Sequence, residues 1–266
     1  MTNEAPLVDA HFHLWMRDHP LTPTAWHSPP TDATVEDLIA THDKFGVVFG
    51  VVAAASLHGE FRDYIGAALK RHRRLRATAI LAPNTGLAAM EQLKAEGFVG
   101  VRLMRSLHDD LPDLDKGDYP AFLRRVAEIG WHVHLVEKKH RYAESIAAVE
   151  ASGARLVIDH MGHVVSPEGI NDPGFKAILA AIERGNTWAK VSGRFRAQSV
   201  EDGNAYAAQL LRVGGGERCL WGSDWPFAGH EGKLTYDKVL ADYYEIVPDP
   251  ALRRQIDRTA LKFYFA

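Results

Sequence analysis

Short apolar runs alternate with longer amphipathic stretches along the whole chain. The short runs are rich in Val, Ile and Leu and are continuously apolar, which is typical of strands buried on both faces of a parallel sheet. They predict strands at residues 7–14, 47–55, 76–82, 98–105, 131–137, 155–161, 187–193 and 218–223. The amphipathic stretches predict helices near residues 34–45, 60–73, 85–96, 119–129, 140–152, 173–185, 199–213, 236–246 and 249–263.

This alternation of strand and helix favours an α/β fold, a TIM (β/α)8 barrel. A doubly wound open sheet is the competing architecture, but histidines stand where a glycine-rich phosphate loop would follow the first strand. No repeat, low-complexity segment or composition shift marks a linker. We therefore expect a single domain over residues 1–266.

The composition excludes several classes of function. The chain has 266 residues, 46% of them apolar, a net charge of −3 and one cysteine, Cys219. The small charge gives no reason to expect nucleic acid or an anionic membrane surface as a partner. A single cysteine excludes a disulfide framework and a thiolate metal cluster. Neither a signal peptide nor a membrane-spanning run is visible, so we expect a cytoplasmic protein; the exposed helices of a barrel allow a homodimer.

Two histidines on the first predicted strand point to chemistry. His11 and His13 are two residues apart in an apolar run, so their side chains lie on the same face, roughly 6.5 Å apart at the backbone. Buried imidazoles need polar partners. The pair can therefore converge on one metal ion, water molecule or substrate oxygen.

Further polar residues gather at the ends of the other predicted strands, where barrel enzymes carry their active sites. Asp224 with His11, His13 and His160 could bind a metal, or Asp224 could act as a general base while the histidines polarise a carbonyl. A helix cap at Asp224 and a core role for His160 are the structural alternatives. The remaining candidates, from the second, fourth, fifth and seventh strands, are Ser56, Arg102, Arg105, His134, Glu137, Arg194 and Arg196.

The four arginines among these residues indicate an anionic substrate, because guanidinium groups match carboxylates. Arg102 and Arg196 are the stronger candidates, and Arg105 and Arg194 are further ones. Arg102 falls within its strand, where an unpaired charge would be costly. The alternative for each arginine is a salt bridge between loops.

Six blocks of sequence, in order, resemble the lactonase branch of the amidohydrolase superfamily: VDAHFHLW, SLHG, GVRL, DHMG, KVSGRFR and WGSDWP. The resemblance implies a distorted barrel that hydrolyses a small carboxylated lactone. In it, Asp224 would activate water, and His11, His13 and His160 would surround the carbonyl or bind one divalent metal, with zinc the expected ion. Ser56, Arg102 and Arg196 would hold the acid groups of the substrate.

Two departures from the family pattern affect the expected ligands. Two-metal members carry a lysine or glutamate on the fourth strand, where this chain has Arg102 and Arg105, so a binuclear site is not expected. His134 and Glu137 stand near the position of a tyrosine in pyrone-dicarboxylate enzymes and are extra candidate ligands. A metal-dependent decarboxylase of an aromatic acid and a non-catalytic binding barrel are the alternatives to a lactonase.

Overall fold

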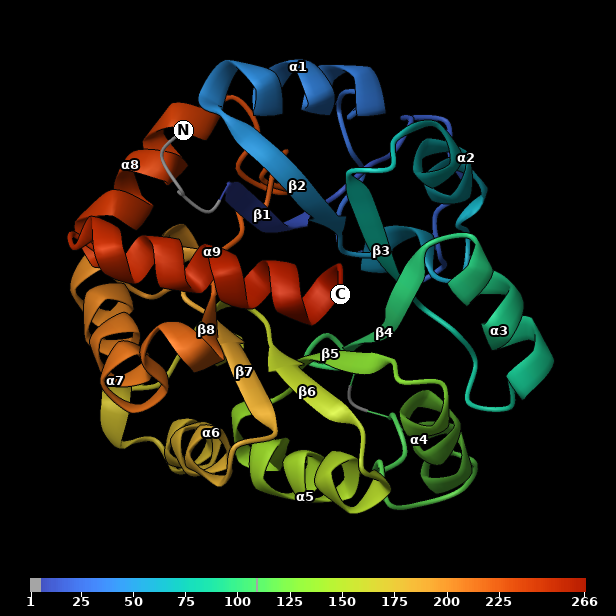
Figure 1. The fold of residues 1–266 in the computed structure, drawn as a ribbon. Helices are drawn as coiled ribbons and strands as arrows, with labels where there is room; N and C mark the ends of the chain where they lie inside the picture. The colour runs from blue at the N-terminus through green and yellow to red at the C-terminus, as the bar shows by residue number, and fades with distance from the viewer. Residues whose placement is uncertain (1–5, 109) are drawn as a thin grey trace.

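The computed structural model describes residues 6–108 and 110–266; the other residues of the predicted domain lie outside this description. Eight parallel strands form one sheet in sequential order (Figure 1). They are β1 (Leu7–Phe12), β2 (Val47–Val52), β3 (Leu75–Ala79), β4 (Phe98–Met104), β5 (His132–Val136), β6 (Arg155–Ile158), β7 (Thr187–Lys190) and β8 (Cys219–Leu220). The helices are α1 (Val35–Phe45), α2 (Asp63–Arg71), α3 (Leu87–Ala95), α4 (Tyr119–Glu128), α5 (Tyr142–Ser152), α6 (Pro173–Arg184), α7 (Val200–Arg218), α8 (Tyr236–Ile246) and α9 (Pro250–Tyr264).

Backbone hydrogen bonds close the ring between its first and last strands. The amide of Ala10 donates to the carbonyl oxygen of Trp221 at 2.8 Å, and the amide of Asp224 donates to that of His11 at 2.7 Å. Because β8 has only two residues, this closure continues beyond it, into the segment that carries Asp224. The predicted TIM barrel is confirmed.

All eight of these strands end earlier than the apolar pattern predicts. β6 stops at Ile158, and the chain then forms a 3-10 turn over His160–His163 in which His160 has φ 47°. Left-handed backbone cannot continue a strand. The polar residues at the strand ends therefore lie on turns, which sets the direction of each side chain separately.

Helix α9 covers the N-terminal end of the barrel, across the front of Figure 1. Its residues Ala260, Phe263 and Tyr264 share an apolar cluster with the strand residues Val8 and Val157. This packing fills the lower interior of the ring. A site inside the ring is thus reached from the opposite end, where the strands finish.

Candidate active site

Asp9 joins β1 to the segment after β8. Its Oδ1 accepts hydrogen bonds from the backbone amides of His11, at 3.1 Å, and Ser223, at 2.8 Å, and its Oδ2 accepts one from the Tyr236 hydroxyl. A Cβ on Gly222 would lie 2.5 Å from the backbone nitrogen of His11, so the two segments approach closely only because this residue is glycine. The segment with His11 and the segment with Asp224 are therefore held side by side.

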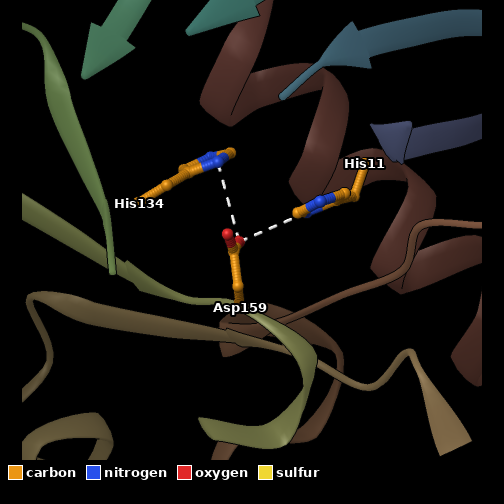
Figure 2. Close-up of side chains that lie close together, drawn as sticks. All are labelled: His11, His134 and Asp159. Carbon is orange, nitrogen blue, oxygen red and sulfur yellow. Dashed lines mark ion pairs between the residues drawn. The ribbon is translucent and has the colours of Figure 1, made fainter. Parts of the chain in front are cut away.

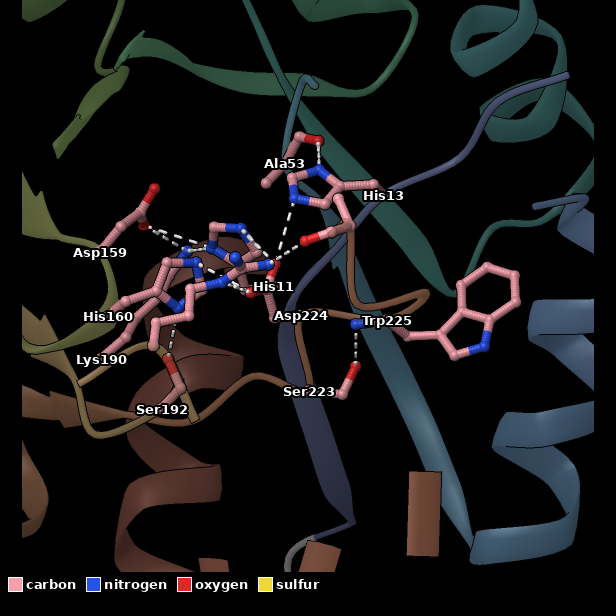
Figure 3. Close-up of polar contacts among 12 residues, drawn as sticks. His11, His13, Ala53, Asp159, His160, Lys190, Ser192, Ser223, Asp224 and Trp225 are labelled. Atoms are coloured by element: carbon pink, nitrogen blue, oxygen red, sulfur yellow. Dashed lines mark hydrogen bonds and ion pairs between the residues drawn. The ribbon is translucent and has the colours of Figure 1, made fainter. Parts of the chain in front are cut away.

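The structure brings together the four residues proposed as the catalytic centre (Figure 3). Oδ1 of Asp224 lies 3.2 Å from Nε2 of His13 and 3.7 Å from Nε2 of His11. Its Oδ2 lies 3.6 Å from Nε2 of His160 and is paired with Nε of Arg196. Asp224 has φ 63° and is 1% exposed. It caps no helix, since α8 begins only at Tyr236.

Burial and charge set the protonation of this centre. Burial alone would raise the pKa of Asp224, but Arg196 and His160 outweigh it and hold the pKa well below its usual value. Burial lowers the pKa of His160 to about 3, against the pull of Asp224. Burial, reinforced by Lys190, also lowers the pKa of His11. At neutral pH an ionised carboxylate, with oxygens that can accept a proton or bind a metal ion, therefore faces two neutral imidazoles.

A second polar cluster lies deeper in the barrel, around Asp159, which is on the turn after β6 (Figure 2). Its Oδ1 is 2.9 Å from Nζ of Lys190, 3.3 Å from Nδ1 of His11 and 3.6 Å from Nδ1 of His134. Its Oδ2 accepts a hydrogen bond from Nε of Arg102 at 3.0 Å. Sequence reasoning gave Asp159 and Lys190 no role. The sequence signal that could have identified them is that each is a charged residue at the end of an otherwise apolar run, Asp159 after β6 and Lys190 at the end of β7.

Lys190 links this deep cluster to the catalytic centre through His11. Nζ of Lys190 lies 2.9 Å from Nδ1 of His11. A charged ammonium can only donate, so it places the proton of the neutral His11 ring on Nε2, which faces Asp224. In that state Nε2–H of His11 is directed toward Oδ1 of Asp224, 3.7 Å away. When Nδ1 carries the proton instead, Oδ1 of Asp159 is its acceptor, and Nε2 is free to bind a metal.

Among the residues that the structure describes, two groups of side chains have the spacing of metal ligands. Nitrogen and oxygen atoms of His11, His134 and Asp159, and of His11, His160 and Asp224, lie within 4.8 Å of one another. The first group already surrounds the Lys190 ammonium, so an added cation does not fit there. The second group fits one divalent ion.

One observation supports the fit of the second group, and another concerns the neighbouring His13. Nε2 of His11 and Oδ1 of Asp224 are buried without a hydrogen-bond partner among the described residues. Nδ1 of His13 is 2.7 Å from the carbonyl oxygen of Ala53, the outer contact that orients many metal-binding histidines. This nitrogen-rich donor set is one that zinc accepts.

A cavity of about 140 Å³ opens above Asp224. Its lining includes His13, His160, His163 and three residues proposed to bind substrate: Ser56, Arg102 and Arg196. A larger hollow of about 840 Å³ lies at the other end of the barrel, beside α9, and its lining includes none of the proposed site residues. The chemistry is therefore concentrated in the smaller cavity.

The other candidate residues do not line this cavity. Arg105 is buried and donates from Nε to Glu137 at 2.7 Å. Arg194 pairs with Asp242 and Glu245. His134 lies below the catalytic centre, with Nε2 3.0 Å from the Tyr264 hydroxyl. For Arg105 and Arg194 the geometry is thus that of salt bridges.

The family model for the amidohydrolases matches residues 8–266. The chain belongs to this family. Among curated proteins, it is 26% identical to 4-sulfomuconolactone hydrolase of Hydrogenophaga intermedia, covering 93% of this chain and 84% of the relative. It is 28% identical to 2-pyrone-4,6-dicarboxylate hydrolase of Comamonas testosteroni, covering 95% and 87%. A solved structure, the probable 2-pyrone-4,6-dicarboxylic acid hydrolase of Acinetobacter baumannii with citric acid bound, superposes with a TM-score of 0.92 at 27% identity, covering 97% and 99%.

Aromatic-acid decarboxylases share the fold alone. The dihydroxybenzoic acid decarboxylase of Polaromonas sp. superposes with a TM-score of 0.68 at 15% identity, covering 99% of this chain and 97% of that one. Within the described part of the chain, no helix has both the length and the apolarity to cross a membrane.

Proposed function

We propose that this amidohydrolase opens the ring ester of a small anionic lactone by attack of water. The observation that carries the proposal is the buried, ionised Asp224, which faces His11, His13 and His160 at the floor of a cavity that two arginines line. The named relatives are lactone hydrolases, which supports this reaction class over a decarboxylase.

In the proposed reaction, Asp224 removes a proton from water, and the water oxygen bonds to the ring carbonyl carbon. Negative charge then develops on the carbonyl oxygen, where the ring of His160, which lines the cavity, would stabilise it by a hydrogen bond. When the ring C–O bond breaks, the leaving oxygen takes the proton back from Asp224, and the product is a hydroxy acid. Arg102 and Ser56 would orient the acid group of the substrate.

A bound metal would take over part of this work. His11, His13, His160 and Asp224 would hold one divalent ion, with zinc the best match, and the ion would polarise the carbonyl as a Lewis acid. Metal analysis of the purified protein, with ring-opening rates before and after chelation, separates this form of the reaction from the metal-free one. We expect the substrate to belong to the breakdown of aromatic or sugar acids.

The test of the proposal is Asp224→Asn, assayed on a panel of carboxylated and sugar lactones. General base catalysis contributes roughly 10²- to 10⁴-fold, so kcat should fall by at least about 100-fold. Asp115→Asn, at an exposed position away from the cavity, is the control for the loss of one charge. Near-normal turnover by Asp224→Asn would remove this residue from the mechanism. Release of carbon dioxide from dihydroxybenzoates, with no lactone opened, would favour the decarboxylase instead.

A further inference from the structure

The two arginines that line the active-site cavity already form hydrogen bonds and ion pairs within the protein. Arg102 donates from Nε to Asp159 at 3.0 Å and from Nη1 to the carbonyl oxygen of Ala54 at 2.8 Å. Arg196 pairs through Nε with Asp224 and donates from Nη2 to the carbonyl oxygen of Ala228 at 3.3 Å. Each guanidinium therefore offers a substrate one nitrogen that has no partner among the described residues: Nη2 of Arg102 and Nη1 of Arg196.

The balance of charge follows from these pairs. Three positive charges, those of Arg102, Arg196 and the deeper Lys190 ammonium, face two buried carboxylates, Asp159 and Asp224. One acid group on a substrate would balance the remaining positive charge, whereas a second would add an uncompensated negative charge, which is costly in a buried site. One acid group can be held by Nη2 of Arg102, and Ser56 belongs to the same cavity lining. The cavity thus suits a mono-anion better than a dicarboxylate.

The rim of the same cavity is apolar. Trp26, on the loop after β1, and Leu107, on the loop after β4, both line it and are 44% and 42% exposed. The Trp26 indole lies against the loop after β8, since a Cβ on Gly229 would be 3.2 Å from its Cζ3. Because β4 and β8 are on opposite sides of the eight-stranded ring, Trp26 and Leu107 flank the mouth from two sides. An apolar group placed between them would be covered by both.

The volume of the cavity limits where a substituent of the lactone ring can lie. A space of about 140 Å³ is close to the roughly 150 Å³ that holds a benzene-sized ring. A lactone ring whose carbonyl reaches Asp224 on the floor therefore leaves little further room inside. A larger substituent has to extend toward the rim, where Trp26 and Leu107 stand.

We infer that the substrate is a lactone with a single acid group and an apolar substituent, aromatic or branched alkyl, which lies between Trp26 and Leu107. This inference rests on the proposed lactone hydrolysis and narrows its substrate class. It sets the chain apart from relatives named for a dicarboxylate. Trp26 and Leu107 would be specificity-determining residues rather than catalytic ones.

The experiment compares three matched lactones: a monocarboxylate with a phenyl substituent, the same lactone without it, and a dicarboxylate. For the wild-type enzyme, kcat/KM should be at least about tenfold higher for the phenyl lactone than for the unsubstituted one, the usual discrimination by a hydrophobic pocket. The dicarboxylate should be the poorest of the three. Trp26→Ala should bring the ratio of phenyl to unsubstituted kcat/KM close to one, chiefly through KM.

Leu21→Ala is the matched control, since Leu21 is on the same loop and 40% exposed but does not line the cavity; it should keep the wild-type ratio. Trp26→Arg should raise kcat/KM for the dicarboxylate relative to the phenyl lactone. The inference is overturned if the wild-type enzyme prefers the dicarboxylate, or if Trp26→Ala leaves the ratio unchanged. Failure of the proposed function would differ from both results, because no lactone of the panel would then be opened.

Discussion

Asp257 on α9 offers a direct test of how the first strand is held. Its Oδ1 accepts a hydrogen bond from the backbone amide of Val8 at 3.0 Å, at the start of the strand that carries His11 and His13. Burial raises the pKa of Asp257 to about 7, against the lowering effects of that hydrogen bond and of Arg253 and Arg258. The folded protein therefore favours the neutral acid, and ionisation near neutral pH costs stability.

The sign and size of the effect follow from this pKa. Between about pH 4 and pH 7 the folded state binds the proton and the unfolded state does not, so the stabilising contribution is complete below about pH 4 and is lost as pH rises through about 7. A pKa that is about 7 in the folded protein and about 4 in the unfolded chain corresponds to about 4 kcal/mol of unfolding free energy, at about 1.36 kcal/mol for each pH unit. Between pH 5 and pH 8 the loss is about 2 to 3 kcal/mol.

The perturbation is Asp257→Asn, which keeps an oxygen for the Val8 amide but cannot ionise. Urea unfolding at pH 5 and pH 8 measures the free energy of unfolding of both proteins. The variant should gain about 2 to 3 kcal/mol relative to wild type between the two pH values. The exposed Asp115→Asn, which removes the same charge, should show no such gain. A stability difference that is the same at both pH values would refute the reasoning.

Two further substitutions test the contacts that build the site. Lys190→Met leaves Oδ1 of Asp159 without its ammonium partner and should lower the free energy of unfolding, measured in urea, by about 3 to 5 kcal/mol. The double variant Lys190→Met/Asp159→Asn should recover part of this loss. A loss below about 1 kcal/mol would contradict the assigned pairing. Gly222→Ala forces a Cβ against the His11 backbone and should reduce kcat/KM about 100-fold. The control Gly86→Ala, which has open space around its Cβ, should keep the wild-type kcat/KM. Equal activities of the two variants would show that the close approach of Gly222 to His11 is unimportant.

Much of the fold could be predicted because its signals are local. Apolar runs marked the eight strands within a few residues, and Thr34 and Ser199 accept hydrogen bonds from Asp37 and Asp202 as helix N-caps. The strand ends were predicted too long, because left-handed residues such as His160 break the extended chain without changing its polarity pattern.

Only part of the candidate site could be predicted from the sequence. The convergence of His11, His13, His160 and Asp224 follows from barrel topology, since the carboxyl ends of parallel strands share one end of the ring. The arginines could not be sorted in the same way. Arg102 and Arg105 are on or next to one strand, yet one reaches the cavity and the other pairs with Glu137.

The sequence by itself determined the eight-fold alternation of strand and helix and the set of polar residues at the strand ends. Only the tertiary structure decided which of those residues meet, and it placed Lys190 between His11, His134 and Asp159. The physical reason is that these contacts join different strands across the interior of a ring, so they depend on register and on the backbone of each turn. Hydrophobic periodicity records which residues are buried, but it carries no information about which partner each buried charge will find.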